Sequence, residues 1–247
     1  MSKSNNLFVI RSLVAPSYSE PSFTSSKITE ALSGETVKVL DKKNDWLYIE
    51  QDDGYKSWLK DFYGTIETEH FLSDYIVTEK LPYPFGTRLR YNKGTFLTVN
   101  DEKYISDKKP TLLDGKPKPD NIIKFAKKLI GCPYRWGGKS SLGFDCSGLV
   151  QTVFLAAGIS LPRDTWQQSD YFIKNKIEGK DSYPGDLHFF GTKNKVTHVG
   201  ISTGGFGIIH CQGWVKEEVF IHNEYGFNKS LADIYLHSCS IRLNFIA

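Results

Sequence analysis

The sequence predicts an α+β protein with a β-rich N-terminal half and a C-terminal half that combines helices with an antiparallel run of strands. Up to residue 105, apolar and polar residues alternate in short runs that are separated by turn residues. From residue 120 the apolar residues recur with the period of a helix. The segment between these halves, up to residue 119, is rich in proline, glycine and lysine and predicts an interdomain linker.

The strands expected in the N-terminal half are short. One set comprises Glu35–Leu40, Trp46–Glu50 and Tyr55–Leu59, and a second set comprises Asp74–Thr78, Thr87–Tyr91, Gly94–Val99 and Lys103–Ile105. Short strands with a turn about every 8–12 residues are typical of small β-barrels. We therefore expect a first barrel over residues 1–66 and a second, degenerate barrel or a linker region over residues 67–112.

The C-terminal domain is expected over residues 119–247. One helix is predicted over Asp120–Ile130, with Asp120 as its N-cap and Gly131 at its end, and a second runs from Cys146 to Ala157. The strands predicted after them are Asp186–Phe190, Val196–Ser202, Phe206–Cys211, Val215–Ile221 and Ser240–Ile246.

Composition excludes several classes of protein. The chain has 247 residues, 40% of them hydrophobic and 24% charged, which argues against disordered and fibrous proteins. The net charge of +3 predicts no nucleic-acid partner. Four cysteines are too few for a disulfide scaffold, and their spacing fits no zinc site, so we expect no metal site.

The sequence contains no apolar run long enough to span a membrane. The apolar stretch Leu7–Ile10 ends at Arg11 and is too short for a signal peptide. We therefore expect a cytoplasmic protein, or an exported one if a leader has been removed.

Cys146 is the first candidate for chemistry. It follows a glycine-rich loop and begins a predicted helix, where free N–H groups and the helix dipole favour a thiolate nucleophile. A backbone N–H near Cys146 would also stabilise an oxyanion. The alternative is a small buried residue at the start of a helix.

Two histidines strengthen the interpretation of Cys146 as a nucleophile. His198 and His210 lie on successive predicted strands, whose antiparallel pairing would bring the two rings side by side. A cysteine followed by a histidine and a second polar residue is typical of a nucleophile, its base and an orienting group. His188 is instead expected to be a core residue.

These residues belong to a set of motifs that resembles the NlpC/P60 family of peptidoglycan cysteine peptidases. The matching segments occur in the family's order at Tyr134–Gly138, Phe144–Gly148, Leu161–Arg163, Tyr183–Leu187, Thr197–Gly200 and Ile209–His210. The resemblance implies a papain-like α+β domain with Cys146 as nucleophile, His198 as general base and His210 as its orienting residue. The N-terminal half resembles bacterial SH3-like domains at Gly34–Val39, Trp46–Ile49 and Asp53–Trp58.

The whole arrangement is similar to the subgroup that cleaves γ-D-glutamyl–diamino acid bonds in peptides with a free N-terminal L-Ala. The resemblance implies that Asp145 binds the substrate amine, although an Asp before a helix is equally explained as an N-cap. It also implies substrate contacts from Tyr134, Ser147 and Thr165. From the SH3-like domain it implies an acidic residue and a tyrosine, for which the candidates are Glu30 and Tyr63, with Glu20 and Tyr55 nearly as good.

The expected function is therefore hydrolysis of free murein peptides in cell-wall recycling, by a monomer without a cofactor. One alternative is an exported hydrolase or amidase that acts on the intact wall. A second alternative is a catalytically inactive wall-binding protein.

Overall fold

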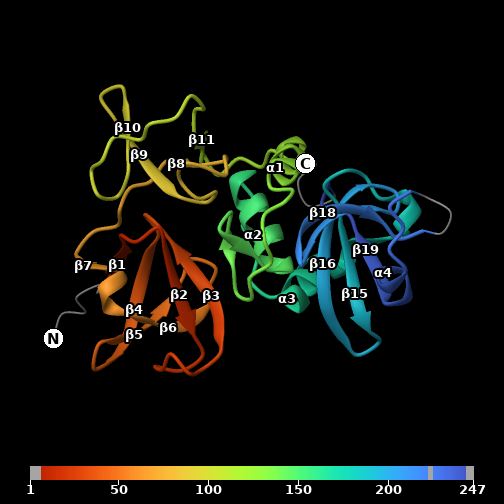
Figure 1. Cartoon of the computed structure of the whole chain (residues 1–247), viewed down its shortest axis with the longest axis horizontal. Helices are drawn as coiled ribbons and strands as arrows, with labels where there is room; N and C mark the ends of the chain where they lie inside the picture. Colours follow the sequence, from red (N-terminus) through yellow and green to blue (C-terminus); the bar gives the residue numbers. More distant parts are fainter. Residues whose placement is uncertain (1–6, 222–224, 243–247) are drawn as a thin grey trace. The chain divides into compact units, whose positions relative to one another are not determined.

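The computed structural model describes residues 7–221 and 225–242, and it divides into two compact units. The first unit runs to Asp114 and also includes Trp136–Leu142. The second unit consists of Gly115–Arg135 and the chain from Gly143 onward. Figure 1 labels most of the strands and helices of both units. No helix in the described part of the chain is long and apolar enough to cross a membrane.

The first unit begins with a seven-stranded antiparallel sheet in the order β3-β2-β6-β5-β4-β1-β7, drawn in red and orange in Figure 1. Its strands are β1 (Leu7–Ile10), β2 (Val14–Tyr18), β3 (Lys27–Leu32), β4 (Thr36–Lys43), β5 (Trp46–Glu50), β6 (Lys56–Lys60) and β7 (Gly64–Glu67). The predicted strands at β4, β5 and β6 are confirmed, whereas β1, β2, β3 and β7 were not predicted. The inward side chains of Phe8, Ile10, Leu47 and Leu59 belong to one buried core.

A smaller four-stranded sheet in the order β10-β9-β8-β11 follows in the same unit. Its strands are β8 (Tyr75–Ile76), β9 (Arg88–Asn92), β10 (Thr95–Leu97) and β11 (Thr111–Leu112). The strand expected at Lys103–Ile105 is wrong, because only an isolated bridge from Lys103 to Leu97 forms there. Strand β11 lies inside the proline-rich stretch that was predicted to be a linker.

Residues Trp136–Leu142, which include β12 (Lys139–Ser140), are held in the first unit by buried polar contacts. The backbone N–H of Lys139 donates to Glu30 Oε2 at 3.0 Å, and Lys139 Nζ lies 3.6 Å from Glu35 Oε1. Ser141 Oγ donates to the carbonyl oxygen of Lys80 at 3.0 Å and accepts from the backbone N–H of Phe85 at 2.9 Å. Buried polar groups without such partners would destabilise the fold, so these contacts fix this short segment.

The second unit packs helices against a six-stranded antiparallel sheet in the order β14-β19-β15-β16-β17-β18. The helices are α1 (Asp120–Lys128), α2 (Cys146–Ala156), α3 (Thr165–Phe172) and α4 (Lys229–Asp233). The strands of this sheet are β14 (Lys176–Ile177), β15 (Leu187–Thr192), β16 (Lys195–Gly204), β17 (Gly207–Gln212), β18 (Trp214–Val219) and β19 (Tyr235–Cys239), and the short strand β13 (Gly143–Phe144) lies outside it. Helices α2 and α3 both lie against β16, the strand that carries His198.

Several predictions for the second unit need correction. The N-cap of α1 is Pro119 rather than Asp120, which is the first residue of the helix. The last described strand, β19, ends at Cys239, so Ser240–Arg242 is not the closing strand that was expected, and the remainder of that prediction lies outside the described residues. Helices α3 and α4 and strands β13, β14 and β19 were not predicted.

Candidate active site

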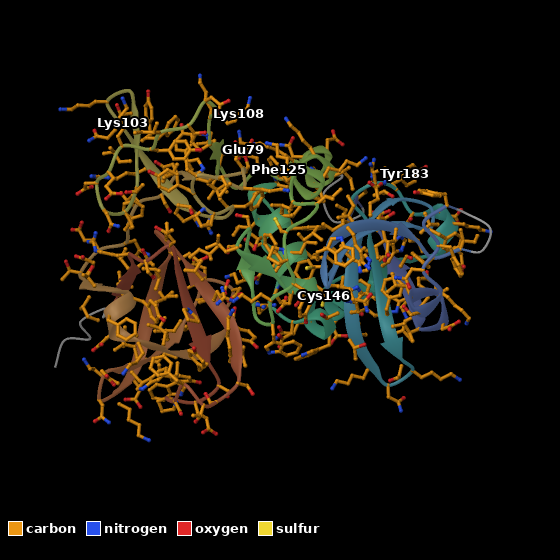
Figure 2. All side chains as sticks on the ribbon, in the orientation of Figure 1. Glu79, Lys103, Lys108, Phe125, Cys146 and Tyr183 are labelled. Carbon is orange, nitrogen blue, oxygen red and sulfur yellow. The ribbon has the colours of Figure 1, made fainter. Side chains whose placement is uncertain are left out.

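Cys146 is the first residue of α2, and the elements around it fix its position. The Asp145 side chain caps the helix by accepting from the backbone N–H of Gly148 at 2.6 Å. The helix is buried on almost all sides, with Leu149, Val150 and Val153 fully enclosed. Figure 2 labels Cys146 at the start of this helix. Because the body of α2 is packed into the core, its first turn presents the thiol at a defined place.

The Cys146 thiol is protonated at rest. Burial and the nearby Asp145 carboxylate raise its pKa, while hydrogen bonds from the Thr165 hydroxyl and from the backbone N–H groups of Val199 and Ser147 act in the opposite direction. Thr165 Oγ1 lies 3.7 Å from Cys146 Sγ. The thiolate predicted from the helix N-terminus is therefore not favoured at rest, because burial outweighs the helix dipole and the N–H groups.

His198 and His210 lie on paired strands, as the antiparallel arrangement predicts. Gly200 on β16 pairs with His210 on β17, and His198 shares the face of Gly200, two residues away. His198 Nε2 is 2.9 Å from His210 Nδ1, and the two rings are nearly perpendicular. Burial, together with the neighbouring His210, lowers the pKa of His198 to about 3. Burial also lowers the pKa of His210. Both rings are therefore neutral at pH 7, and a neutral imidazole can accept a proton.

The pair of histidines continues to Glu218, which the sequence analysis missed. Glu218 Oε2 lies 2.7 Å from His210 Nε2. The residue is on β18, where Glu218 pairs with Ile208 of β17, so its side chain lies on the same face as His210. The available sequence signal was alternation along Trp214–Val219, which places Lys216 and Glu218 on one face of the strand. Their partner on β17 follows only from the register.

Asp145 is paired with Arg163, a second residue to which the sequence assigned no role. Arg163 Nη2 donates to Asp145 Oδ2 at 2.6 Å and Nη1 donates to Oδ1 at 3.1 Å. Arg163 Nη1 also donates to Ser147 Oγ at 2.8 Å. The guanidinium is 2% exposed, so this is a buried and bidentate ion pair. Asp145 thus has the N-cap role that was the alternative explanation, and it is also fixed by Arg163.

Tyr134 lies beside the same thiol and is partly exposed to solvent. Burial, together with the negative charges of Asp145 and of the ionised Cys146 at high pH, raises the pKa of Tyr134 to about 12. Its phenol therefore stays protonated and can donate a hydrogen bond at neutral pH. The second unit thus brings together Tyr134, Asp145, Cys146, Ser147, Thr165, His198 and His210.

Glu30 and Tyr63, the remaining candidates, belong to the first unit. Glu30, on β3, is 1% exposed, is ion-paired with Lys27 and accepts from the backbone N–H of Lys139. Tyr63 ends the short 3₁₀ helix Asp61–Tyr63 and packs against the core of this unit. Of the two alternatives, Glu20 is exposed and Tyr55 is half-buried. A part for these residues in substrate binding stays a prediction.

His188 is fully buried on β15, with its Nδ1 atom 2.7 Å from Ser238 Oγ. Burial lowers the pKa of His188 to about 4, so it is a neutral core residue, as expected. Over residues 7–221 and 225–242, no group of three or more His, Cys, Asp or Glu side chains is arranged to hold a metal ion.

Comparison with known proteins gives concordant matches. Residues 131–232 match the NlpC/P60 family, and residues 18–63 match the bacterial SH3 domain. A gamma-D-glutamyl-L-lysine dipeptidyl-peptidase of Bacillus subtilis (strain 168) is 30% identical over 238 residues, which cover 83% of this chain and 79% of the relative. A protein of the same name from Bacillus cereus is 28% identical over 233 residues, which cover 74% of this chain and 66% of the relative.

A solved structure has the same fold. The crystal structure of an NlpC/P60 family protein from Bacillus cereus aligns with a TM-score of 0.72 and covers 95% of this chain and 99% of that chain. The sequences are 22% identical over the alignment, so this likeness concerns the fold alone.

Proposed function

Because this chain belongs to the NlpC/P60 family, we propose that it is a cysteine peptidase that hydrolyses the γ-D-glutamyl–L-diamino acid bond of free peptidoglycan-derived peptides with an N-terminal L-Ala. The observation that carries the proposal is the hydrogen-bonded pair of neutral histidines on β16 and β17, with the Val199 amide of β16 hydrogen-bonded to the Cys146 thiol. The names of the two Bacillus relatives support the choice of bond.

The protonation states determine how the reaction starts. The Cys146 thiol carries its proton at rest and His198 is neutral, so His198 accepts that proton as the sulfur attacks. The S–H bond breaks, an N–H bond forms on His198, and Sγ bonds to the γ-carbonyl carbon of D-Glu. The amide C–N bond then breaks, and His198 returns the proton to the leaving amine. A water molecule, deprotonated by His198, hydrolyses the thioester and releases L-Ala-γ-D-Glu.

Hydrogen-bond donors near the thiol suit the negative charge that develops on the carbonyl oxygen. The backbone N–H of Ser147 is in the first turn of α2, and the Tyr134 phenol stays protonated because its pKa is about 12. Fixed donors in a site that excludes water stabilise such an oxyanion strongly. We therefore assign the binding of the oxyanion to the backbone N–H of Ser147 and the phenol of Tyr134.

The free amine of the substrate is assigned to Asp145 and Ser147. A cationic amine in a buried site needs an anionic partner, and Asp145 is 7% exposed and adjacent to the nucleophile. Arg163 holds both residues in place through its bonds to Asp145 and to Ser147 Oγ. Thr165, whose hydroxyl contacts the thiol, is assigned to the substrate contacts of the same site.

The test compares L-Ala-γ-D-Glu-L-Lys, its meso-diaminopimelate analogue, the N-acetylated forms of both and intact sacculi, with products identified by mass spectrometry. We expect the free peptides to release L-Ala-γ-D-Glu and the acetylated forms and sacculi to react at least about 100-fold more slowly, since their blocked nitrogen carries no positive charge for Asp145 to bind. Equal rates for free and acetylated peptides would refute the amine site. Rapid release from sacculi would favour a wall hydrolase. Cys146→Ala should abolish turnover while leaving the circular dichroism spectrum unchanged.

A further inference from the structure

A continuous line of hydrogen bonds links the start of α4 to the catalytic pair. It runs from the backbone N–H of Leu231 through Asn228, Glu218 and His210 to His198. We propose that Glu218 is a positioning residue that fixes which nitrogen of His210 and of His198 carries hydrogen, and thereby leaves Nδ1 of His198 free to accept the thiol proton. The inference rests on the proposed roles of Cys146 and His198.

The backbone N–H of Leu231 can only donate a hydrogen bond, and it therefore fixes which partner donates in each of the following hydrogen bonds. Asn228 is the N-cap of α4, and its Oδ1 accepts from the backbone N–H of Leu231 at 3.1 Å and from the Ser230 hydroxyl at 2.6 Å. An amide side chain has its acceptor at one end and its donors at the other. Because Oδ1 is held at the helix, Nδ2 points to Glu218 and donates to Oε2 at 2.7 Å.

Glu218 accepts hydrogen bonds from both of its neighbours in the line, because an ionised carboxylate cannot donate one. Burial would raise the pKa of Glu218, but hydrogen bonds from Asn228, His210 and Lys216 hold it below its usual value. Lys216 Nζ lies 3.1 Å from Oε1, and this ion pair holds the second oxygen of the carboxylate in place. Since Oε2 cannot donate, the 2.7 Å contact with His210 requires the hydrogen to be on His210 Nε2.

The hydrogen positions on the two rings then follow. A neutral imidazole has one N–H and one lone pair. With its hydrogen on Nε2, neutral His210 presents the lone pair of Nδ1 to His198, so the 2.9 Å contact is an N–H donation from His198 Nε2. Neutral His198 is left with a lone pair on Nδ1, the form in which it can act as a base. With the opposite direction, Nδ1 of His198 would carry hydrogen and could not accept the thiol proton.

The same arrangement stabilises the charged state that the reaction passes through. When His198 takes the thiol proton on Nδ1, its positive charge is stabilised by the hydrogen bond from Nε2 to Nδ1 of His210, whose own N–H donates to the Glu218 carboxylate. A buried carboxylate that orients a catalytic imidazole is worth several orders of magnitude in rate in serine proteases. Glu218 acts here through one additional histidine.

The decisive experiment exchanges donor and acceptor without changing the net charge. In the double variant Glu218→Gln/Asn228→Asp, the carboxylate introduced at the N-cap of α4 still caps that helix, and the amide N–H₂ introduced on β18 is drawn to this carboxylate and donates to His210. This reverses the direction of the line and puts hydrogen on Nδ1 of His198. We expect kcat to fall about 1,000-fold, with KM little changed. Glu217→Gln, at an exposed position on the same strand, is the matched control and should retain full activity.

A spectroscopic readout separates this role from a merely structural one. Long-range ¹H–¹⁵N spectra of the full-length protein at pH 7 should show hydrogen on Nε2 of both His198 and His210, and on Nδ1 of both in the double variant. Single Glu218→Gln should keep the wild-type hydrogen positions, because Asn228 still donates to the Gln oxygen, and should lose only about 10-fold in kcat. A wild-type spectrum with hydrogen on Nδ1 of His198 would overturn the proposal even if no variant folds.

An assay without a peptide substrate distinguishes an error in the proposed substrate from an error in the role of Glu218. Alkylation of Cys146 by iodoacetamide needs no peptide, and its rate at pH 7 should fall in the double variant but not in Glu217→Gln. If the wild-type protein cleaves none of the peptides while the spectra and the alkylation rates behave as expected, only the substrate assignment is wrong. Unchanged alkylation and unchanged spectra in a folded double variant would refute the role of Glu218.

Discussion

At Gly200, the absence of a side chain decides where His210 can lie. A Cβ atom at this position would be 2.4 Å from Ile208 Cδ1 and 2.9 Å from His210 Cβ. Real side chains do not approach so closely, so either the strands or the His210 side chain would have to move. Gly200 therefore helps to keep His198 Nε2 and His210 Nδ1 2.9 Å apart.

We expect Gly200→Ala to lower kcat by at least about 10-fold and to destabilise the second unit by about 1–3 kcal/mol, because the added methyl overpacks the face of β16. Peptide turnover and urea unfolding measure the two effects. In an Ile208→Ala background, Gly200→Ala should cost less additional stability, because the contact with Ile208 is removed. The loss of activity should persist, because the added methyl group still collides with His210. Equal additional costs in both backgrounds would contradict this account.

The sequence predicted the meeting of His198 and His210 because alternation and a short turn determine how neighbouring strands pair. It could not predict Glu218, because the partner of His210 depends on the register of β17 and β18 and on an asparagine at the start of α4, a helix that had not been predicted. Arg163 was visible in a motif, but its burial against Asp145 follows only from tertiary packing.

Helix α3 matters because its first residue, Thr165, lies against the nucleophile. Its start is fixed by a capping box in which Asp164 and Gln167 bond reciprocally, and Gln167 Oε1 accepts from the Asp164 backbone N–H at 3.0 Å. A capping box satisfies N–H groups that the first turn of a helix leaves open. The position of the Thr165 hydroxyl therefore depends on this cap.

Replacing Asp164 with Ala should destabilise the second unit by about 1 kcal/mol through loss of the N-cap. We also expect a drop in kcat/KM of a few fold, as Thr165 becomes less well fixed. Urea unfolding and peptide turnover are the measurements. Asp170→Ala, at an exposed position on the same helix, is the control. A loss of stability as large in Asp170→Ala as in Asp164→Ala would contradict a specific role for the cap.

Elements with a clear apolar period were predictable, and those defined by long-range pairing were not. Helix α2 and strands β15 to β18 follow the predicted ranges closely, whereas β2, β3 and β14 were missed. Strand β2 contains Pro16 and is bordered by serine-rich turns, which hides its alternation. Helix α3 was detectable, since Asp164 and Gln167 have the spacing of a capping box, but its eight residues contain few apolar ones.

The chain as a whole should lose stability in mild acid because it buries neutral imidazoles. An unfolded histidine takes up a proton near pH 6.5, whereas burial lowers the pKa of His188 to about 4 and that of His198 to about 3. Below pH 6.5 the unfolded state therefore binds more protons than the native state, and stability falls as the pH falls. Each imidazole contributes up to about 1.4 kcal/mol per pH unit until its native pKa is reached.

Hydrogen exchange measured between pH 7 and pH 4.5, after correction for intrinsic rates, should show protection in β15–β17 falling with pH. His188→Gln should make this dependence shallower, because one buried imidazole is removed. His70→Gln, at an exposed position in the first unit, should leave it unchanged. Protection in β15–β17 that stays constant over this range would contradict the neutral state of His188 and His198 in the folded protein.

At the scale of the molecule, the family and the SH3-like region predicted from the motifs are confirmed. The composition of residues 108–119 indicated a change of architecture, because proline, glycine and lysine provide little apolar surface to bury. The inclusion of Trp136–Leu142 in the first unit could not be predicted, since this segment lies inside the most informative motif of the second.

That segment bears on how proteins of this kind can diversify. A gene rearrangement that replaced the N-terminal region as a cassette would separate Glu30 and Glu35 from the seven residues encoded further downstream, and with them from the N–H and ammonium groups of Lys139. Glu30 would keep its ion pair with Lys27 and Glu35 its hydrogen bond from Gln51, but each would lose a polar contact to Lys139, which would destabilise the first unit. Viable exchanges must therefore recombine at two places in the gene, so the SH3-like region and the loop before Cys146 are expected to be inherited together.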